Sequence, residues 1–369
     1  MKQIHISLIG GQPVAAYLGI ADAQPEHTLL VCSSQSFEEA KRVASCCPDK
    51  VIEIMQMDLA DIPSIEKTVM ALREQYAEDR VTLNLTGGSK LWSLLFYAGF
   101  RDHPDVRFIY IGTDHLLTDL DSHESRPLTM DRDVQFRLYG NPLAHYKRFD
   151  DYTEADLQVC RQIEQARRYN FEAFNRLTTA LSSSEVQQVR GSQQGEIKQP
   201  DGQHVRWDKS KQTVWLSICH KYKGWKDFEL CSDHIMELMF FSGWFEFLVA
   251  NALDSHPQVR QVWMHSAFMT RGNALKNEAG IVADMGDKLL FVACRTQVKD
   301  PAEIDSFRSV LKSYGEMGGK GLLVTNVPLP AVIMDKCKDS DILTFHFDYT
   351  KSFKANCEGL DGVMSEAVS

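Results

Sequence analysis

Over its first 112 residues the chain alternates short apolar runs with longer runs of helical period. The apolar runs have the length of strands and cover residues 4–9, 28–32, 51–55, 81–85 and 106–111. Helix-like runs lie between them at 37–44, 61–76 and 91–100. Strands that alternate with helices predict a parallel, doubly wound α/β sheet with helices on both faces. In such sheets, ligands bind beyond the carboxyl ends of the strands.

The pattern changes after residue 112. Residues 113–150 carry short runs broken by turn residues, which predict an antiparallel extension and a connecting segment. Residues 152–181 predict two helices, the second with a face of aromatic residues. Residues 182–217 are polar with short strand-like runs, and Pro200-Asp201-Gly202 is typical of a hairpin turn. The middle of the chain therefore predicts a small α+β module of helices and a hairpin.

A third pattern begins near residue 232. One long apolar helix is predicted over 233–253, followed by strands at 259–264, 280–283 and 289–294. A helix at 302–314, a strand at 322–325, a helix at 329–337 and a strand at 343–347 complete the series. Helix, three strands, helix and strand is the order of restriction-endonuclease-like α/β domains. We therefore expect three parts, with boundaries at 1–150, 151–231 and 232–369.

A glycine turn in the first part is the strongest chemical signal. Asn84-Leu85-Thr86-Gly87-Gly88-Ser89-Lys90 joins a strand-like run to a helix-like run. Glycines let the backbone approach a ligand, and a helix N-terminus offers free N–H groups and a partial positive charge. The run is neither a Walker A loop nor GxGxxG, because Ser89 separates the glycines from Lys90. A ligand-free turn between strand and helix is the alternative.

Small polar residues follow three of the predicted strands, which favours the ligand hypothesis. They are Gly10, Gly11, Gln12 and Pro13, then Ser33, Ser34 and Gln35, and finally Asn84, Thr86, Gly87, Gly88, Ser89 and Lys90. Because carboxyl ends of parallel strands meet at one edge of a sheet, these residues form our predicted binding site.

Composition narrows the class of protein. The 369-residue chain has a net charge of −10. This charge argues against a protein that regulates by binding duplex DNA, but it neither favours nor excludes a site for a small anionic ligand. Nine scattered cysteines without a CxxC pair indicate reduced thiols and no zinc site. No apolar run approaches the length of a membrane span, and the first residues lack a signal-peptide pattern. We expect a cytoplasmic protein that does not bind membranes.

Together the motifs resemble a known family. The Asn-Leu-Thr-Gly-Gly-Ser-Lys run and the turns at Gly10 and Ser33 resemble the CRISPR-associated Rossmann fold, CARF, whose dimers bind cyclic oligoadenylates. The third part resembles the PD-(D/E)xK nuclease domain of the cyclic-oligoadenylate-activated DNA/RNA nucleases of type III CRISPR systems, with Gly243-Trp244-Phe245-Glu246 as its core-helix motif. The resemblance covers nearly the whole chain in the same domain order.

The nuclease motif departs from the family pattern at its centre. Gly280 stands where the metal-binding Asp is expected, Ala293 where the second carboxylate is expected, and Arg295 in place of the lysine. Glycine and alanine side chains cannot bind Mg²⁺ or Mn²⁺, and arginine is a poor proton donor at neutral pH. The resemblance therefore implies a degenerate site in which no catalytic residue and no metal are expected.

Migration of the site is the alternative. Glu246, Glu278, Asp284 and Asp287 are nearby carboxylates, although a surface turn is the commoner reason for a run such as Asp284 to Asp287. Glu246 lies in an apolar helix and needs a partner if it is buried, for which Arg295 is our candidate.

The resemblance implies a homodimer that binds a cyclic oligoadenylate, cyclic tetra-adenylate first among them, with a degenerate nuclease-like effector domain. That domain would contact DNA or RNA without cutting it, or act as a dimerising or regulatory partner. Lys90 and residues 86–89 would contact phosphate or ribose, and Gln12, Ser33 and Gln35 the adenine. An active endonuclease with a displaced Mg²⁺ or Mn²⁺ site is the alternative. A third hypothesis is slow cleavage of the ring itself, with Lys90 stabilising the transition state. The sequence leaves ring size and nucleic-acid preference open.

Overall fold

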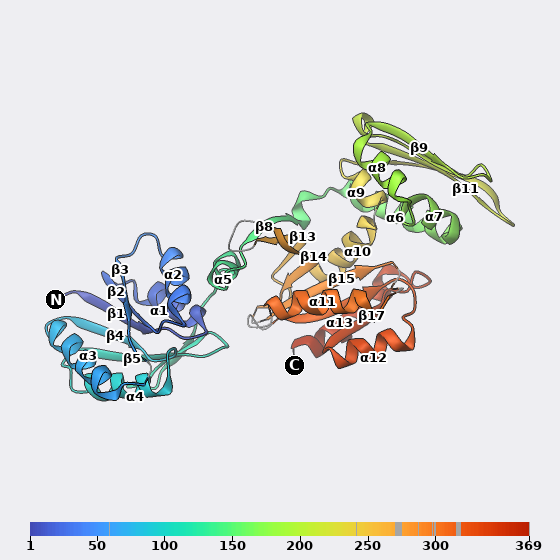
Figure 1. The fold of residues 1–369 in the computed structure, drawn as a ribbon. Helices are drawn as coiled ribbons and strands as arrows, with labels where there is room; N and C mark the ends of the chain where they lie inside the picture. The colour runs from blue at the N-terminus through green and yellow to red at the C-terminus, as the bar shows by residue number, and fades with distance from the viewer. Residues whose placement is uncertain are drawn as a thin grey trace. The chain divides into compact units, whose positions relative to one another are not determined.

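The computed structural model describes residues 1–58, 60–240, 242–269, 275–286, 288–296, 298, 300–314 and 319–368, of which 275–278, 313 and 366–368 are described by their backbone alone. The chain forms two compact units (Figure 1). Unit 1 contains Met1–Leu143 and Phe268–Lys276, and unit 2 contains Ala144–Ala267 and Asn277–Ser369. The boundaries at 150 and 231 stay a prediction.

The sheet of unit 1 has seven strands in the order β3-β2-β1-β4-β5-β6-β7. The first five pair in parallel, whereas β5 with β6 and β6 with β7 pair antiparallel. The strands are β1 (Gln3–Leu8), β2 (His27–Cys32), β3 (Ile52–Gln56), β4 (Arg80–Asn84), β5 (Val106–Ile111), β6 (Leu116–Asp119) and β7 (Ser125–Pro127). The predicted parallel α/β sheet is confirmed.

Helices cover both faces of this sheet (Figure 1). They are α1 (Pro13–Ala23), α2 (Phe37–Ser45), α3 (Ile62–Gln75) and α4 (Lys90–Phe100). Alternate residues of each strand point to opposite faces, so that Leu29 and Val31 join the core under α3 and α4, whereas Leu30 and Cys32 join the core under α1 and α2. The predicted helices α2, α3 and α4 are confirmed, whereas α1 was not predicted.

A helix in the segment 113–150 was not predicted. α5 (Arg132–Leu138) begins at Asp131, whose carboxylate accepts hydrogen bonds from the N–H groups of Asp133 and Val134. Its other end is tied to α2, because Arg42 Nε donates to the carbonyl of Leu138 at 2.6 Å. Seven residues are too few to show a helical period in the sequence. So short a helix is stabilised mainly by its cap and its packing.

The middle of the chain forms a four-stranded antiparallel sheet in the order β12-β11-β10-β9. Its elements are α6 (Glu154–Tyr169), α7 (Phe171–Thr178), α8 (Ser183–Gly191), β9 (Gln194–Lys198), β10 (His204–Asp208), β11 (Thr213–His220) and β12 (Gly224–Cys231). The predicted hairpin turn joins β9 to β10, and Gln199 N–H donates to Gln203 O across it at 2.8 Å. The unpredicted α8 begins with a capping box between Ser182 and Glu185.

A six-stranded mixed sheet follows, in the order β17-β16-β15-β14-β13-β8. Its elements are β8 (Leu143–Arg148), α9 (Ile235–Met239), α10 (Gly243–Asp254), β13 (Gln261–Met269), β14 (Leu275–Asp284), β15 (Leu289–Arg295), α11 (Ala302–Tyr314), β16 (Lys320–Thr325), α12 (Ala331–Asp339), β17 (Ile342–His346) and α13 (Phe353–Val368). The predicted order of helix, three strands, helix and strand is confirmed. β8 and α13 were not predicted.

The prediction of one helix over 233–253 was wrong. The chain forms α9 and α10 instead, and Ser242 between them has φ +69°, which ends a right-handed helix. Gly243 packs so closely that a Cβ there would lie 2.1 Å from the carbonyl oxygen of Glu237. The break therefore depends on a close approach of two helices, which an apolar run does not reveal.

One hydrophobic core joins the small sheet to the six-stranded sheet within unit 2. It runs through the sequence from Tyr152 to Met364 and includes Trp207 of β10, Trp244 of α10 and Val292 of β15. The segment predicted as a connector therefore shares its core with the nuclease-like segment.

Candidate functional site

The three predicted polar turns lie side by side in unit 1. β1 pairs with β2 on one side and with β4 on the other, so the carboxyl ends of these strands are neighbours. The strand order reverses between β1 and β4, which is the switch point where ligands bind in such sheets. A Cβ on Gly10 would lie 3.0 Å from Gly88 N, and one on Gly87 would lie 2.0 Å from Leu8 O. The turns after β1 and β4 are thus in contact.

Asn84 and Thr86 shape the glycine turn from within. Asn84 is buried, donates to Ala15 O at 3.0 Å and accepts from both the N–H and the hydroxyl of Thr86. The hydroxyl of Thr86 in turn accepts from Ile111 N at 2.7 Å. These bonds connect β4 to α1 and β5. We assign both residues a role in holding the turn, and their contact with a ligand stays a prediction.

The start of α4 presents the one cation of the turn. Ser89 caps the helix by accepting from Trp92 N at 3.1 Å. Gly88 has φ +72°, a conformation that favours glycine. Lys90 is exposed, and within the described part of the chain it has no ion pair. The turn therefore offers a helix N-terminus and a free ammonium group to an anion.

The turn after β2 divides into a buried and an exposed half. Ser33 and Ser36 hydrogen-bond one another, and Ser36 Oγ donates to Ile9 O at 3.0 Å. Ser34 and Gln35 are exposed, as is Gln12 at the start of α1. The buried serines hold this turn against the end of β1, while the exposed amides remain available to a ligand that carries hydrogen-bonding edges.

The positions that the resemblance implies to be degenerate also come together, in unit 2. The antiparallel register of β14 and β15 pairs Ile281 with Val292, which sets Gly280 opposite Ala293. Two positions without a polar side-chain atom thus face one another where the resemblance implies two carboxylates. Arg295 donates to Cys294 O and lies 3.7 Å from a carboxylate oxygen of Glu303.

The nearby carboxylates have separate places. Asp284 ends β14 and accepts from Gly286 N at 2.8 Å, as a turn residue does. Glu246 on α10 fills the space beside Gly280, where a Cβ would lie 2.9 Å from its Oε1. His265 engages Glu246, and the pairing of Glu246 with Arg295 stays a prediction. Asp287 and the side chain of Glu278 lie outside the described residues.

Glu246 belongs to a charged cluster that the sequence did not predict. His265 of β13 lies with Nε2 2.8 Å from Glu237 Oε1 and with Nδ1 3.4 Å from Glu246 Oε2. Glu237 also accepts hydrogen bonds from Lys147 and from the hydroxyl of Tyr152. We call Lys147, Tyr152, Glu237, Glu246 and His265 the Glu–His cluster.

The Glu–His cluster neutralises its own charges. Burial acts to raise the pKa of Glu237, but its bonds from His265, Lys147 and Tyr152 outweigh burial and bring the pKa to about 2. Burial acts to lower the pKa of His265, and the bond to Glu237 with the charge of Glu246 raises it above its usual value. The surroundings therefore favour the charged form of both groups.

This donor set does not fit the divalent metal that the fold family implies. Position 280 and position 293 supply no oxygen ligand, and both Glu237 and Glu246 face the imidazole of His265. Among the described residues, no group of three or more His, Cys, Asp or Glu side chains is arranged to hold a metal ion.

The sequence contained a weak signal for the Glu–His cluster. Glu237 and His265 each interrupt an apolar run, and a charged group inside such a run requires a partner. Their partners lie far away in the sequence, since Lys147 and His265 are 118 positions apart, so pattern alone could not pair them. His265 also has φ +50°, a local distortion of β13 that places its ring between the two carboxylates.

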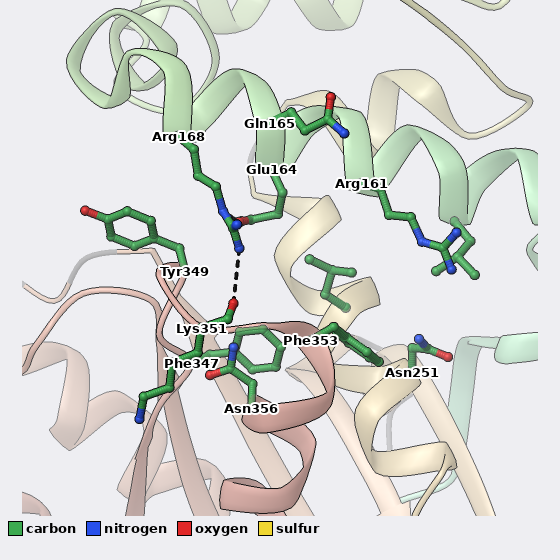
Figure 2. A pocket seen from close by; sticks show the side chains of 12 residues that line it. Arg161, Glu164, Gln165, Arg168, Asn251, Phe347, Tyr349, Lys351, Phe353 and Asn356 are labelled. Atoms are coloured by element: carbon green, nitrogen blue, oxygen red, sulfur yellow. Dashed lines mark hydrogen bonds and ion pairs between the residues drawn. The ribbon is translucent and has the colours of Figure 1, made fainter.

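A hollow of about 340 Å³ opens elsewhere on unit 2, between α6, α10 and residues 347–356 (Figure 2). Arg168 points across it and donates to Lys351 O at 3.3 Å, and its Nε lies 3.6 Å from Glu164. The lining residues are Leu157, Arg161, Glu164, Gln165, Arg168, Leu248, Asn251, Phe347, Tyr349, Lys351, Phe353 and Asn356. None of them belongs to the predicted sites.

Two further findings concern the predicted surroundings of the protein. Each of the nine cysteines is a free thiol. In the described part of the chain no helix combines the length and the apolar character needed to cross a membrane.

Comparisons with known proteins place unit 1 in a family. The family model of the Card1 CARF domain matches residues 4–137. No curated protein matches the sequence.

Solved structures match the fold of the whole chain. Can2 from Sulfobacillus thermosulfidooxidans, solved with cyclic tetra-adenylate, aligns over 99% of this chain and 97% of its own at 16% identity and a TM-score of 0.65. Protein VC1899 from Vibrio cholerae aligns over 99% and 98% at 13% identity and a TM-score of 0.71. A type III CRISPR defence DNA nuclease activated by cyclic oligoadenylate aligns over 90% of this chain and 47% of its own, at 15% identity and a TM-score of 0.52. Residues 4–137 therefore form a Card1-type CARF domain, in a chain that shares its complete fold with Can2 and VC1899.

Proposed function

We propose that this chain is a sensor of cyclic oligoadenylate in type III CRISPR defence. A homodimer would bind cyclic tetra-adenylate across two copies of the turns after β1, β2 and β4, because a ring with twofold symmetry suits a twofold interface. The observation that carries the proposal is the meeting of Gly10 with Gly87 and Gly88 at the switch point of a Card1-type CARF domain. The complex of Can2 with cyclic tetra-adenylate supports the choice of ring.

Calorimetry with cyclic tri-, tetra- and hexa-adenylate tests this proposal. We expect one tetra-adenylate ring per two chains, and Lys90→Ala should weaken binding about tenfold or more, since a hydrogen bond to a charged group is worth roughly 1.5–3 kcal/mol. Lys67→Ala is the matched control, because Lys67 is an exposed lysine of α3 outside the turns. Absence of binding to all three rings would refute the proposed function.

The second part of the proposal is that the nuclease-like domain does not cut nucleic acid. It rests on Gly280 and Ala293 facing one another and on Glu246 being engaged by His265. Plasmid DNA and labelled RNA, incubated with Mn²⁺ and the ring, should stay intact. Metal-dependent cleavage that disappears in Glu246→Gln would contradict this and establish the displaced site instead.

A further inference from the structure

The tip of the β11–β12 hairpin concentrates cations and exposed aromatic rings. Lys221, Lys223 and Lys226 lie within seven residues that also contain Tyr222 and Trp225 and no carboxylate. Tyr222 is 83% exposed, the highest value for a large hydrophobic side chain among the described residues, and Trp225 is 54% exposed. A chain of net charge −10 thus carries one local patch of positive charge and open ring faces.

The hairpin holds this patch in a defined shape. Its strands pair without interruption from Thr213 opposite Cys231 to His220 opposite Gly224. The last residue of α6 supports the tip, because Tyr169 donates its hydroxyl to Gly224 O at 3.0 Å. Groups that are already ordered lose little conformational entropy when they bind a partner.

The three ammonium groups are placed against rings and not against carboxylates. Lys223 and Lys226 lie 5.8 and 5.5 Å from the ring of Tyr169, and Lys221 lies 5.4 Å from the ring of Tyr222. Within the described part of the chain none of the three forms an ion pair. Their charge therefore remains available to an anionic partner.

Trp225 is partly packed and partly open to solvent. The tip of its indole packs on the β9–β10 turn, since a Cβ on Gly202 would lie 3.4 Å from Trp225 Cη2. About half of the side chain stays open to solvent, so a flat group can stack on it. Exposed rings next to lysines are the two components of surfaces that bind single strands, because bases stack on rings and phosphates pair with ammonium groups.

We propose that the β11–β12 hairpin binds single-stranded nucleic acid, with Tyr222 and Trp225 stacking on bases and Lys221, Lys223 and Lys226 contacting phosphates. A lipid surface is the weaker candidate, because each ring is flanked by lysine and no exposed Leu, Ile or Val accompanies them at the tip. The inference goes beyond ring sensing and does not depend on it, since the hairpin lies outside the CARF domain.

The test uses the full chain without any cyclic oligoadenylate, so its outcome is separate from that of the ring titration. The probe is a fluorescein-labelled oligothymidylate of about 12 nucleotides, within the usual site size of such surfaces, followed by anisotropy at several NaCl concentrations. Lys221→Ala/Lys223→Ala/Lys226→Ala should weaken binding about tenfold or more. The slope of log affinity against log salt concentration should become shallower by about 2, because each phosphate contact to a single strand contributes roughly 0.7 to it. The matched control is Lys312→Ala/Lys338→Ala/Lys354→Ala, which removes the same charge from exposed sites on α11, α12 and α13.

Fluorescence isolates the stacking step. Trp92, Trp207, Trp244 and Trp263 are buried and Trp215 is partly buried, so quenching by the oligonucleotide should come mainly from Trp225 and should fall strongly in Trp225→Phe. Tyr222→Ala/Trp225→Ala should weaken binding about fivefold or more, because stacking is worth roughly 1–3 kcal/mol per base.

Three results would overturn the inference. The first is that the oligonucleotide does not bind at low salt, about 50 mM NaCl. The second is that the hairpin and control triple variants lose the same affinity, and the third is that the single strand and its duplex bind equally well. Hairpin-dependent binding to phosphatidylserine vesicles without binding to the oligonucleotide would show a lipid surface instead.

Discussion

The two candidate sites are built on opposite principles. The turns of unit 1 depend on glycine, since a Cβ on Gly10 or Gly87 would lie only 3.0 or 2.0 Å from the backbone of the neighbouring segment. Their polar atoms are neutral apart from Lys90. The Glu–His cluster of unit 2 depends on charged side chains that engage one another.

This difference shows how to tell an open site from a closed one. In unit 1 the internal hydrogen bonds hold the shape, while Gln12, Gln35 and Lys90 remain exposed at the rim. In unit 2 each charge of the cluster already has an opposite charge beside it, so an incoming ion gains little. We therefore predict that the turns of unit 1 bind a ligand and that the Glu–His cluster of unit 2 has a structural role.

Removing a charge from the Glu–His cluster should have the largest effect. Glu237→Gln keeps the size of the side chain but leaves Lys147 without its carboxylate and His265 with Glu246 alone. Breaking a buried ion pair costs about 3–5 kcal/mol, and we expect roughly 3 kcal/mol here because the cluster is partly exposed. Urea unfolding measures it. Glu358→Gln, in an exposed pair with Lys354, should cost less than about 0.5 kcal/mol, and equal losses would contradict the cluster's role.

The two units should respond to acid in opposite directions. His5 in unit 1 is fully buried, and burial lowers its pKa to about 3. Below about pH 6.5 the unfolded chain binds a proton that folded His5 does not, so stability falls by up to about 1.4 kcal/mol per pH unit between about pH 6.5 and 3. His265 in unit 2 has a raised pKa in the folded chain. Its contribution to the free energy of unfolding is therefore complete below about pH 6.5 and is lost as the pH rises through the raised pKa.

Thermal unfolding between about pH 8 and 4.5, a range that spans the ordinary histidine pKa, separates these effects. Trp92 is the sole tryptophan of unit 1 and reports on it alone in difference spectra against Trp92→Phe. His5→Gln should flatten the acid loss of unit 1, and His265→Gln should flatten the alkaline loss of unit 2. An unchanged acid slope in His5→Gln would show that other groups control unit 1.

The last prediction concerns the close contact between the turns after β1 and β4 in unit 1. Gly87→Ala forces a methyl group toward Leu8 O, and overpacking costs about 1–3 kcal/mol. It should also abolish ring binding, because the turns after β1 and β4 must separate. Gly191→Ala in α8 is the matched control, since nothing lies within 4 Å of its Cβ position and it lies outside the predicted turns. If both variants bind the ring equally, the close approach is not required.

Much of the fold could be predicted because its signal is local. The five strands of residues 1–112 and the helices α2, α3 and α4 follow from their periods, and the end of each strand from its polar turn. α1, α5, α8 and α13 were missed, and α5 and α8 are short helices held by caps at Asp131 and Ser182. The break at Ser242 and the Glu–His cluster were missed because both depend on contacts between distant residues.

The candidate site shows the same limit. The sequence predicted which turns meet, because parallel strands fix that from order alone. It did not show that Asn84 and Thr86 use their hydrogen bonds inside the turn, since a polar residue after a strand has the same appearance in either role.

The shared core of unit 2 limits how this protein can diversify. Trp207 of the small sheet, Phe174 of α7 and Trp244 of α10 pack in one cluster with the strands of the nuclease-like sheet. A recombination event at residue 231 would separate these rings and expose apolar surface on both products. A replacement of the nuclease-like sheet by another domain would therefore have to exchange residues 152–364 as one block to keep this core intact.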